Sequence, residues 1–409
     1  MLFATLLKSM IRRGSMVLVD SAGRRHRIGD DSAPCTTVRL THRQLDYTLA
    51  LNPKLSIGEA YIDGTLRVEQ GSIFDFLMLL ASNLDAVGPG HWLNWGGHAR
   101  RLLPARNPAG RARRNVAHHY DLSPSLYELF LDADWQYSCA YFLNPGDSLE
   151  AAQGQKKRHI AAKLLLDRPG LRVLDIGSGW GGLALFLARQ FGADVTGITL
   201  SVEQQRESTA RAAAAGLSDR VRFHLRDYRQ EQGAYDRIVS VGMFEHVGRG
   251  NYATFFAAMR RLLREDGVAL LHSIGDSEPP GPINPFIRKY IFPGADVPAL
   301  SEVLRTVERS GLMTTDIEIL RLHYAETLLR WRERFVANRA EAVRLYDERF
   351  FRMWEFYLAL CEVGFRARSS MVFQMQLAKR NDVLPLTRNY MMDGERPSLR
   401  QAAMSDAAE

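Results

Sequence analysis

The chain has 409 residues, which is long for one domain and therefore predicts two. Its net charge of +7 favours an acidic partner, such as nucleic acid, an anionic membrane surface or an anionic ligand. Three widely spaced cysteines give no sign of a disulfide framework or a zinc site, so no metal is expected and a reducing cytoplasm is the expected compartment. The absence of a run of about eighteen apolar residues argues against a membrane-spanning helix.

Residues 1–97 predict a small α+β domain. An amphipathic helix is expected over residues 1–13 rather than a signal peptide, because the apolar part is short and the charges follow it. Alternating residues around the turn at 21–23 predict a hairpin, with a further strand and a helix after it. The expected ranges are 16–20 and 24–28 for the hairpin, 36–40 for the strand and 73–83 for the helix.

Residues 98–116 predict a linker rich in arginine. Six arginines lie between His98 and Arg114, and prolines and a glycine break any long helix. A solvated linker and an exposed strap for membrane phosphates both fit this pattern, and each arginine near an anionic membrane contributes about 1 kcal/mol. No aromatic residue is interleaved to stack on single-stranded bases, so a nucleic-acid partner is not expected.

Residues 117–394 alternate between apolar strand-like runs and helical segments. Strands are predicted at 172–176, 193–198, 220–225, 235–241, 267–273, 315–320 and 369–378. Helices are expected between most of them and also at 125–131 and 149–166, and a helical insertion at 327–366 separates the last two strands. This order predicts a doubly wound, mostly parallel seven-stranded α/β sheet, with a flexible tail at 395–409.

The first strand of this domain leads into the glycine-rich turn Asp175-Ile176-Gly177-Ser178-Gly179-Trp180-Gly181-Gly182. Such a turn brings backbone N–H groups and a helix N-terminus to a nucleotide-like ligand. A dinucleotide site also needs an acid at the tip of the second strand, where this chain has Thr199-Leu200-Ser201. The missing acid argues against NAD, and the position of Asp175 suits the cationic amino acid part of S-adenosylmethionine (SAM).

Polar residues follow the later strands, at the edge of the sheet where ligands bind. Asp227 is positioned to accept from an adenine amine, and Glu245 and His272 are expected at adjacent strand tips. From spacing alone this last pair is either functional or an ordinary polar pair. Cys139 is predicted to be a small buried hydrophobe.

Two segments are expected to act as covers, and the first of them, residues 117–142, is expected to fold over the glycine turn as a lid. Residues 117–142 directly precede the α/β core of this domain, and residues 279–298 form a long apolar loop with six prolines. A loop of this kind either encloses a ligand or packs as a lid on the core, and both roles remain open.

These residues resemble the cyclopropane fatty acid synthases and the mycolic acid cyclopropane synthases. The matching segments run in order across about residues 117–380: His119-Tyr120-Asp121-Leu122, 137–142, 174–182, 199–204, Phe244-Glu245-His246, 271–274 and His323-Tyr324. Several independent motifs in one order make the match specific. The first 115 residues resemble the extra domain of the phospholipid-acting members. Ser178 stands where many members have cysteine, which leaves the turn intact because this position acts through its backbone.

The resemblance implies a class I SAM methyltransferase domain with a Rossmann-like fold and two bound groups. The residues implied to bind SAM are Tyr137, Ser138, Asp175, Gly177, Gly179, Trp180, Gly181, Thr199, Ser201, Gln204, Asp227 and Tyr228. The residues implied to hold a catalytic bicarbonate ion are Cys139, Glu245, His272, Ile274 and Tyr324.

The activity implied is transfer of the SAM methyl carbon onto a cis double bond of an unsaturated phospholipid acyl chain. The enzyme would be peripherally attached to the inner face of the membrane, and the resemblance suggests a homodimer. Aromatic faces can stabilise the carbocation that this reaction forms, and the candidates are Tyr137, Tyr141, Phe142, Phe244 and Tyr324.

Three other functions remain open from the sequence. One is a SAM methyltransferase that makes a methyl-branched chain or methylates a small-molecule amine. The second is a membrane-surface protein with a vestigial cofactor domain, and the third is an NAD oxidoreductase.

Overall fold

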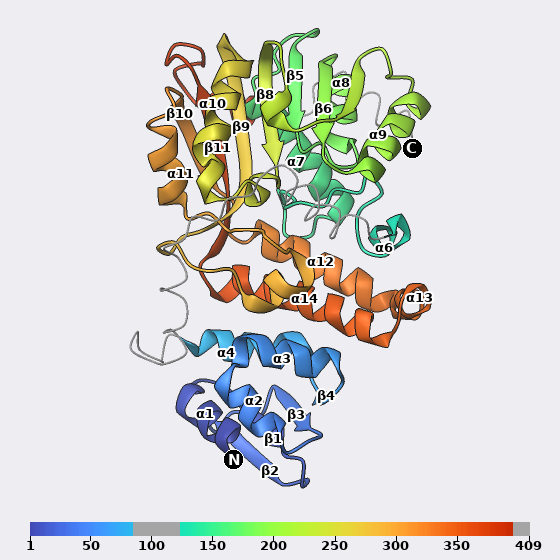
Figure 1. Cartoon of the computed structure of the whole chain (residues 1–409), viewed down its shortest axis with the longest axis vertical. Coiled ribbons are helices and arrows are strands. Elements are labelled where there is room, and N and C mark those ends of the chain that lie inside the picture. The colour runs from blue at the N-terminus through green and yellow to red at the C-terminus, as the bar shows by residue number, and fades with distance from the viewer. Residues whose placement is uncertain (85–122, 396–409) are drawn as a thin grey trace.

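A computed structural model describes residues 1–84 and 123–395, and its upper layer is a seven-stranded sheet (Figure 1). The strand order is β10-β11-β9-β8-β5-β6-β7, and β11 runs antiparallel to both of its neighbours. The strands are β5 (Arg172–Ile176), β6 (Asp194–Thr199), β7 (Val221–Leu225), β8 (Tyr235–Val241), β9 (Leu263–Asp276), β10 (Met313–Ile319) and β11 (Ser370–Ala378). The predicted fold class and all seven predicted strands are confirmed, and β9 is longer than expected.

Helices cover both faces of this sheet. Successive residues of β5 point to opposite faces, so Val173 and Leu174 belong to two separate apolar clusters. The covering helices are α7 (Leu149–Lys163), α8 (Gly182–Phe191), α9 (Val202–Ala214), α10 (Tyr252–Leu262) and α11 (Leu300–Val307). A short helix, α6 (Pro124–Glu128), precedes them and α15 (Asn389–Glu395) follows the last strand. This arrangement makes the sheet doubly wound, as predicted.

The insertion between β10 and β11 forms a helical layer beneath the sheet (Figure 1). It consists of α12 (His323–Ala337), α13 (Arg339–Leu345) and α14 (Glu348–Ala367), so the predicted helical character of 327–366 is confirmed. The side chain of Asp347 accepts a 2.6 Å hydrogen bond from Phe350 N and thereby caps α14. The layer lies between the sheet and the N-terminal part of the chain (Figure 1).

Residues 1–84 form an N-terminal unit with its own four-stranded sheet, in the order β2-β1-β3-β4. Its elements are α1 (Leu2–Met10), β1 (Ser15–Val19), β2 (Arg25–Gly29), β3 (Thr36–Leu40), α2 (Leu45–Leu51), α3 (Pro53–Ile62), β4 (Leu66–Gln70) and α4 (Ile73–Ser82). The predicted helix, hairpin, strand and second helix are all present, whereas α2, α3 and β4 were not predicted. Within the ranges 1–84 and 123–395, no helix is long and apolar enough to cross a bilayer.

Several predictions concern residues outside the described ranges. They are the domain boundary at residue 97, the arginine-rich segment 98–116, the motif His119-Tyr120-Asp121-Leu122 and the tail beyond residue 395.

The N-terminal unit and the helical layer share one apolar core, which we call the seam. Gly58 of α3 lies directly against the rings of Phe286 and Phe356. The hydroxyl of Tyr61 donates to Glu355 Oε2 at 2.7 Å across the same seam. The two parts are therefore joined by packing as well as by polar contacts.

Gly58 and Gly154 provide a matched pair for testing the seam. A Cβ on Gly58 would lie 2.4 Å from Phe286 Cδ2, whereas a Cβ on Gly154, within α7, would lie no closer than 3.9 Å to Arg158. We expect Gly58→Ala to lower the free energy of unfolding by about 1–3 kcal/mol through overpacking. Gly154→Ala should raise it by about 0.5–1 kcal/mol through helix propensity. Chemical denaturation measures both, and a stabilising Gly58→Ala would show that the seam is loosely packed.

Candidate functional site

The glycine-rich turn joins β5 to α8 with a backbone that only glycine adopts easily. Gly177 and Gly179 have φ values of +84° and +53°. A Cβ on Gly177 would also lie 2.7 Å from Met243 Cβ, a residue that follows β8. The turn therefore packs closely against the connection that follows β8.

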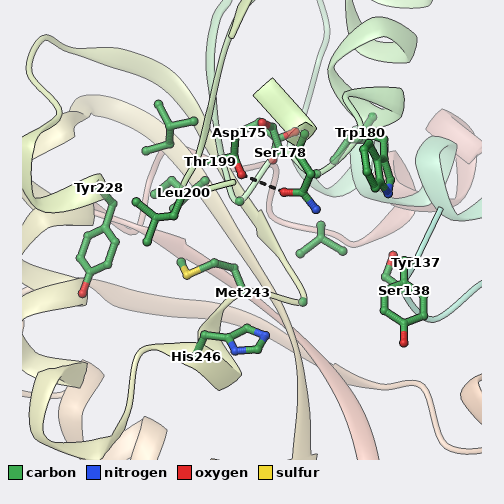
Figure 2. A pocket seen from close by; sticks show the side chains of 18 of the residues that line it. Tyr137, Ser138, Asp175, Ser178, Trp180, Thr199, Leu200, Tyr228, Met243 and His246 are labelled. Atoms are coloured by element: carbon green, nitrogen blue, oxygen red, sulfur yellow. Dashed lines mark hydrogen bonds between the residues drawn. The ribbon is translucent and has the colours of Figure 1, made fainter. Parts of the chain in front are cut away.

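The turn lines a cavity that we call the glycine-turn cavity (Figure 2). Ten of the twelve residues implied to bind SAM line it: Tyr137, Ser138, Asp175, Gly177, Gly179, Trp180, Thr199, Gln204, Asp227 and Tyr228. Gly181 and Ser201 do not. Gly181 is the N-cap of α8 and has a left-handed backbone conformation. Ser201 Oγ accepts from Gln204 N at 3.2 Å and caps α9. Both residues therefore fix the start of a helix beside the cavity without lining it.

Two side chains of the glycine-turn cavity are held in place by their neighbours. Thr199 Oγ1 donates to Gln204 Oε1 at 2.8 Å, the dashed line in Figure 2. This bond leaves the amide N–H groups of Gln204 available as donors. Asp227 accepts from the guanidinium of Arg229 at 2.8 and 2.6 Å, so a ligand amine would have to share this carboxylate with Arg229.

Buried charges of both signs line the glycine-turn cavity. Burial raises the pKa of Asp175 to about 7. Burial lowers the pKa of Lys156 to about 8, and this lysine of α7 was not predicted from the sequence. Its position in a helix of mixed composition carries no local motif, so only the three-dimensional fold reveals it.

A second cavity of about 970 Å³ adjoins the first, and we call it the apolar cavity. All five residues implied to hold bicarbonate line it: Cys139, Glu245, His272, Ile274 and Tyr324. The two cavities share the lining residues Tyr137, Ser138, Gly242 and His246. They therefore meet beside the cluster of five.

Glu245 lies in a short 3-10 turn directly after β8 and is 7% exposed. Its Oε1 accepts from Ile274 N at 2.6 Å, while Oε2 is buried and has no hydrogen-bond partner among the described residues. Burial raises the pKa of Glu245 to about 7. The orphaned oxygen is the kind of group that a polar ligand would satisfy.

His272 lies on β9 next to Glu245 and is neutral. Burial, aided by the positive charge of Lys156, lowers the pKa of His272 to about 3. Gln374 Nε2 lies 3.1 Å from His272 Nδ1 and donates to it, so the ring proton is on Nε2 and can be donated. Burial also raises the pKa of Cys139, which therefore stays a thiol.

Three of the aromatic residues predicted to face a carbocation are elsewhere. Tyr141, Phe142 and Phe244 line neither cavity. Tyr141 stacks between the rings of His159 and His323, with centroids 4.1 and 4.8 Å away, and Phe244 is fully buried in the sheet core. Besides Tyr137 and Tyr324, the Phe and Tyr rings at the apolar cavity are Phe3, Phe292, Phe356, Tyr357 and Phe365, which the sequence did not single out as facing a carbocation.

The proline-rich loop at 279–298 lines the apolar cavity, so it encloses space rather than only covering the core. Asp296 N donates to the backbone oxygen of Glu245 at 2.9 Å, and the side chain of Asp296 accepts from Arg249 at 2.7 Å. Residues 135–138, from the predicted lid at 117–142, line the glycine-turn cavity, and residues 137–139 line the apolar cavity.

Comparisons with known proteins agree with this architecture. Residues 108–375 match the family model described as mycolic acid cyclopropane synthetase. The cyclopropane-fatty-acyl-phospholipid synthase of Escherichia coli is 40% identical over 329 residues, covering 80% of this chain and 83% of that protein. The chain therefore belongs to the mycolic acid cyclopropane synthetase family.

Other members extend the comparison to products and structures. The tuberculostearic acid methyltransferase UfaA1 of Mycobacterium tuberculosis is 38% identical over 347 residues, with 80% of this chain and 79% of that protein covered. The crystal structure of mycolic acid cyclopropane synthase CmaA1, complexed with SAH and CTAB, is 34% identical with a TM-score of 0.62, covering 65% of this chain and 97% of that one. The chain is therefore a SAM-dependent methyltransferase of the class I fold.

The raised pKa of Glu245 predicts how stability depends on pH. The folded state holds this proton more tightly than the unfolded state, so the stabilisation is complete below pH 4.5 and is lost as the pH rises to about 7. Glu245→Gln lacks this titration. Between pH 5 and pH 7.5, we expect the free energy of unfolding of the unaltered protein to fall relative to that of Glu245→Gln by roughly 2–3 kcal/mol.

Chemical denaturation at the two pH values measures this difference. Glu265→Gln changes an exposed carboxylate on the same sheet and should show no such shift. A constant difference between the unaltered protein and Glu245→Gln would mean that Glu245 ionises normally in the folded state.

Proposed function

We propose that the protein is a cyclopropane-fatty-acyl-phospholipid synthase. It transfers the SAM methyl carbon onto a cis double bond of an unsaturated acyl chain, with bicarbonate as the base. The observation that carries this proposal is the junction of the two cavities beside Glu245 and His272. A methyl donor in one cavity and an alkene in the other would meet at that junction.

The glycine-turn cavity suits SAM. Its lining offers a buried carboxylate, amide donors and the ring of Trp180, and the related CmaA1 structure is complexed with SAH. The helix N-terminus behind the glycine turn adds backbone N–H groups. SAM supplies an electrophilic methyl group on a sulfonium centre.

The apolar cavity suits an acyl chain. It is lined by apolar residues from four parts of the chain: Phe3, Leu6, Leu7 and Met10 of α1, Leu77, Leu80 and Ala81 of α4, Ile283, Ile287 and Phe292 of the loop 279–298, and Leu328, Phe356 and Leu360 of the helical layer. Its volume of about 970 Å³ lies at the upper end of ligand sites in general. The N-terminal unit therefore forms one wall of the proposed lipid site.

The cluster of five residues fits a bicarbonate ion. The unpartnered Oε2 of Glu245 can accept the bicarbonate O–H, and Nε2–H of His272 can donate to its oxygens. Tyr324 and the neutral thiol of Cys139 line the same wall. Bicarbonate bound there would supply a weak base for the methyl proton.

The surrounding residues exclude water and stabilise charge. The double bond is a poor nucleophile, so its π electrons must be aligned on the methyl carbon in a dry site. The new C–C bond forms as the C–S bond breaks, which leaves a carbocation on the chain. Tyr137, Tyr324 and Tyr357 line this space, and their aromatic rings can stabilise that cation. Loss of one proton from the added methyl then closes the ring.

We also propose peripheral attachment to the inner face of the membrane and a homodimer as the working form. The net charge of +7 supports attraction to anionic lipid, and pairing two copies would strengthen such attachment.

A second candidate product is a methyl-branched chain. It is favoured by the 38% identity to UfaA1, whose name describes a methyltransferase for tuberculostearic acid. The same carbocation can lose a proton from the added methyl group to close the ring or, after a hydride shift, lose one to give a methylene branch. A saturated methyl branch would in addition need a hydride donor as reductant. Methylation of a small-molecule amine is the remaining alternative.

Mass spectrometry of the lipid products tests the proposed function. With SAM and vesicles of unsaturated anionic phospholipid, we expect each converted acyl chain to gain one CH2 and to lose its double bond. A saturated branch would carry two further hydrogens, and a methylene branch would keep a double bond. Unchanged lipid, with SAM still bound, would contradict the proposal and favour a small-molecule substrate.

Glu245→Ala tests the base. We expect it to lower turnover by at least about 100-fold because the proton acceptor loses its anchor. SAM affinity, measured by calorimetry, should stay within about threefold, because Glu245 does not line the glycine-turn cavity. Glu265→Ala removes an exposed carboxylate and serves as the control. Full activity of Glu245→Ala without bicarbonate dependence would refute the role of this residue.

Ala81→Phe tests whether the N-terminal unit forms the lipid site. Ala81 lines the apolar cavity from α4, whereas Ser82 on the same helix is exposed. A ring at position 81 should occupy part of the cavity and reduce kcat/KM for phospholipid roughly tenfold, with SAM affinity unchanged. Ser82→Phe adds the same ring outside the cavity and should leave kcat/KM unchanged. Equal effects of the two substitutions would argue against an acyl chain beside α4.

A further inference from the structure

Lys156 is a buried cation without an ion-pair partner among the described residues. Its side chain lies in α7 and is 1% exposed. The ammonium donates to Gln136 Oε1 at 2.7 Å and to Ser138 Oγ at 2.8 Å, both neutral acceptors. An ammonium has three N–H groups, so one of them is not accounted for by these bonds.

Asp175 is the complementary buried anion of the same cavity. It lies at the end of β5, is 2% exposed, and has no side-chain hydrogen bond among the described residues. The other charged side chains that line the cavity are paired directly. Arg229 binds Asp227 at 2.6 Å, and Arg226 binds Glu231 at 2.8 Å.

Leaving two opposite charges buried and without direct partners is costly. The penalty amounts to several kcal/mol per ion and is tolerated mainly where a ligand needs the charges. The amino acid part of SAM carries one carboxylate and one ammonium. Lys156 and Asp175 therefore match a zwitterion in sign and in number.

Ser138 links Lys156 to the space inside the cavity. Its hydroxyl oxygen accepts from the lysine, which leaves the hydroxyl proton to be donated elsewhere. Ser138 lines both cavities, so an anion beside it would receive a hydrogen bond backed by a buried positive charge.

We propose that Lys156 is the residue that selects the α-carboxylate of the methyl donor, through its third N–H group and through the hydroxyl of Ser138. Asp175, in the same cavity, would accept from the α-ammonium. This inference rests on the proposed function, because it requires SAM in the glycine-turn cavity.

A purely structural role for Lys156 is the competing explanation. The lysine could simply hold the segment 136–138 against α7. The two roles differ in which ligands they affect. If Lys156 only holds the segment 136–138, its loss should weaken the binding of every ligand of the cavity equally. If it binds the α-carboxylate, its loss should weaken only the binding of ligands that carry the amino acid part.

Calorimetric titration of the full-length protein with two ligands separates these roles. S-Adenosylhomocysteine carries the amino acid part, and 5′-methylthioadenosine has the same adenosine and thioether sulfur without it. We expect Lys156→Met to weaken S-adenosylhomocysteine at least about tenfold while 5′-methylthioadenosine stays within about threefold. Arg158→Met removes another cation of α7 that does not line the cavity, and should leave both affinities within about twofold.

Ser138→Ala is a second, milder variant that removes the hydroxyl without removing the buried charge. We expect it to weaken S-adenosylhomocysteine at least about threefold and to leave 5′-methylthioadenosine unchanged. It also keeps the proposal testable if Lys156→Met does not fold.

Equal losses for the two ligands would assign Lys156 a bracing role and overturn the proposal. Unchanged affinity for S-adenosylhomocysteine in the lysine variant would do the same. Failure of the unaltered protein to bind either ligand would instead overturn the proposed function itself.

Discussion

Hydrogen bonds from α7 fix the segment on which both cavities depend. Lys156 binds the side chains of Gln136 and Ser138, and Gln153, one turn earlier, donates to the backbone oxygens of the same two residues. Ala140 N donates to Thr327 Oγ1 of α12 at 3.0 Å, which fastens the other end of the segment. The segment is therefore held both by a helix that covers the sheet and by the helical layer. This fixes the position of the two cavities relative to each other, as the alignment of two reactants would require.

Burial sets the protonation states around this junction. Asp175 and Glu245 are acids whose pKa values rise to about 7, while Lys156 and His272 are bases whose pKa values fall to about 8 and about 3. All four shifts have desolvation as their largest cause, and they push each group toward its neutral form. Such a site is poorly solvated before any ligand arrives, which suits a reaction with a cationic intermediate that water would intercept.

Much of this arrangement follows from local sequence patterns. Most of the seven strands are short runs rich in apolar residues with turns between them, so their positions were predictable. The rule that parallel strands end at one edge placed Glu245 and His272 together. The glycine turn was predictable because positive φ values demand glycine. The bulk of the residues implied by the family resemblance indeed line the two cavities.

The remainder depends on long-range packing that no local pattern encodes. Lys156 was missed because its burial depends on the segment 136–138 folding over α7. Phe244 was misplaced because a strand-tip position does not fix the direction of a side chain. It packs against Tyr252 and Phe255 in the sheet core, with ring centroids 4.5 and 5.1 Å away, instead of facing the cavity. The contribution of α1 and α4 to the apolar cavity follows from the seam, which joins parts that are distant in the chain.

The seam also has a consequence during protein synthesis. The partner of Tyr61 across it is Glu355, 294 residues further along the chain. At translation rates of about 5–20 residues per second, the N-terminal unit waits roughly 15–60 s before α14 is made. Throughout that interval the parts of α3 and α4 that α14 later covers have no partner. The surface that later helps to enclose the proposed lipid site therefore stays exposed during this interval, and it is a site where the nascent chain can aggregate.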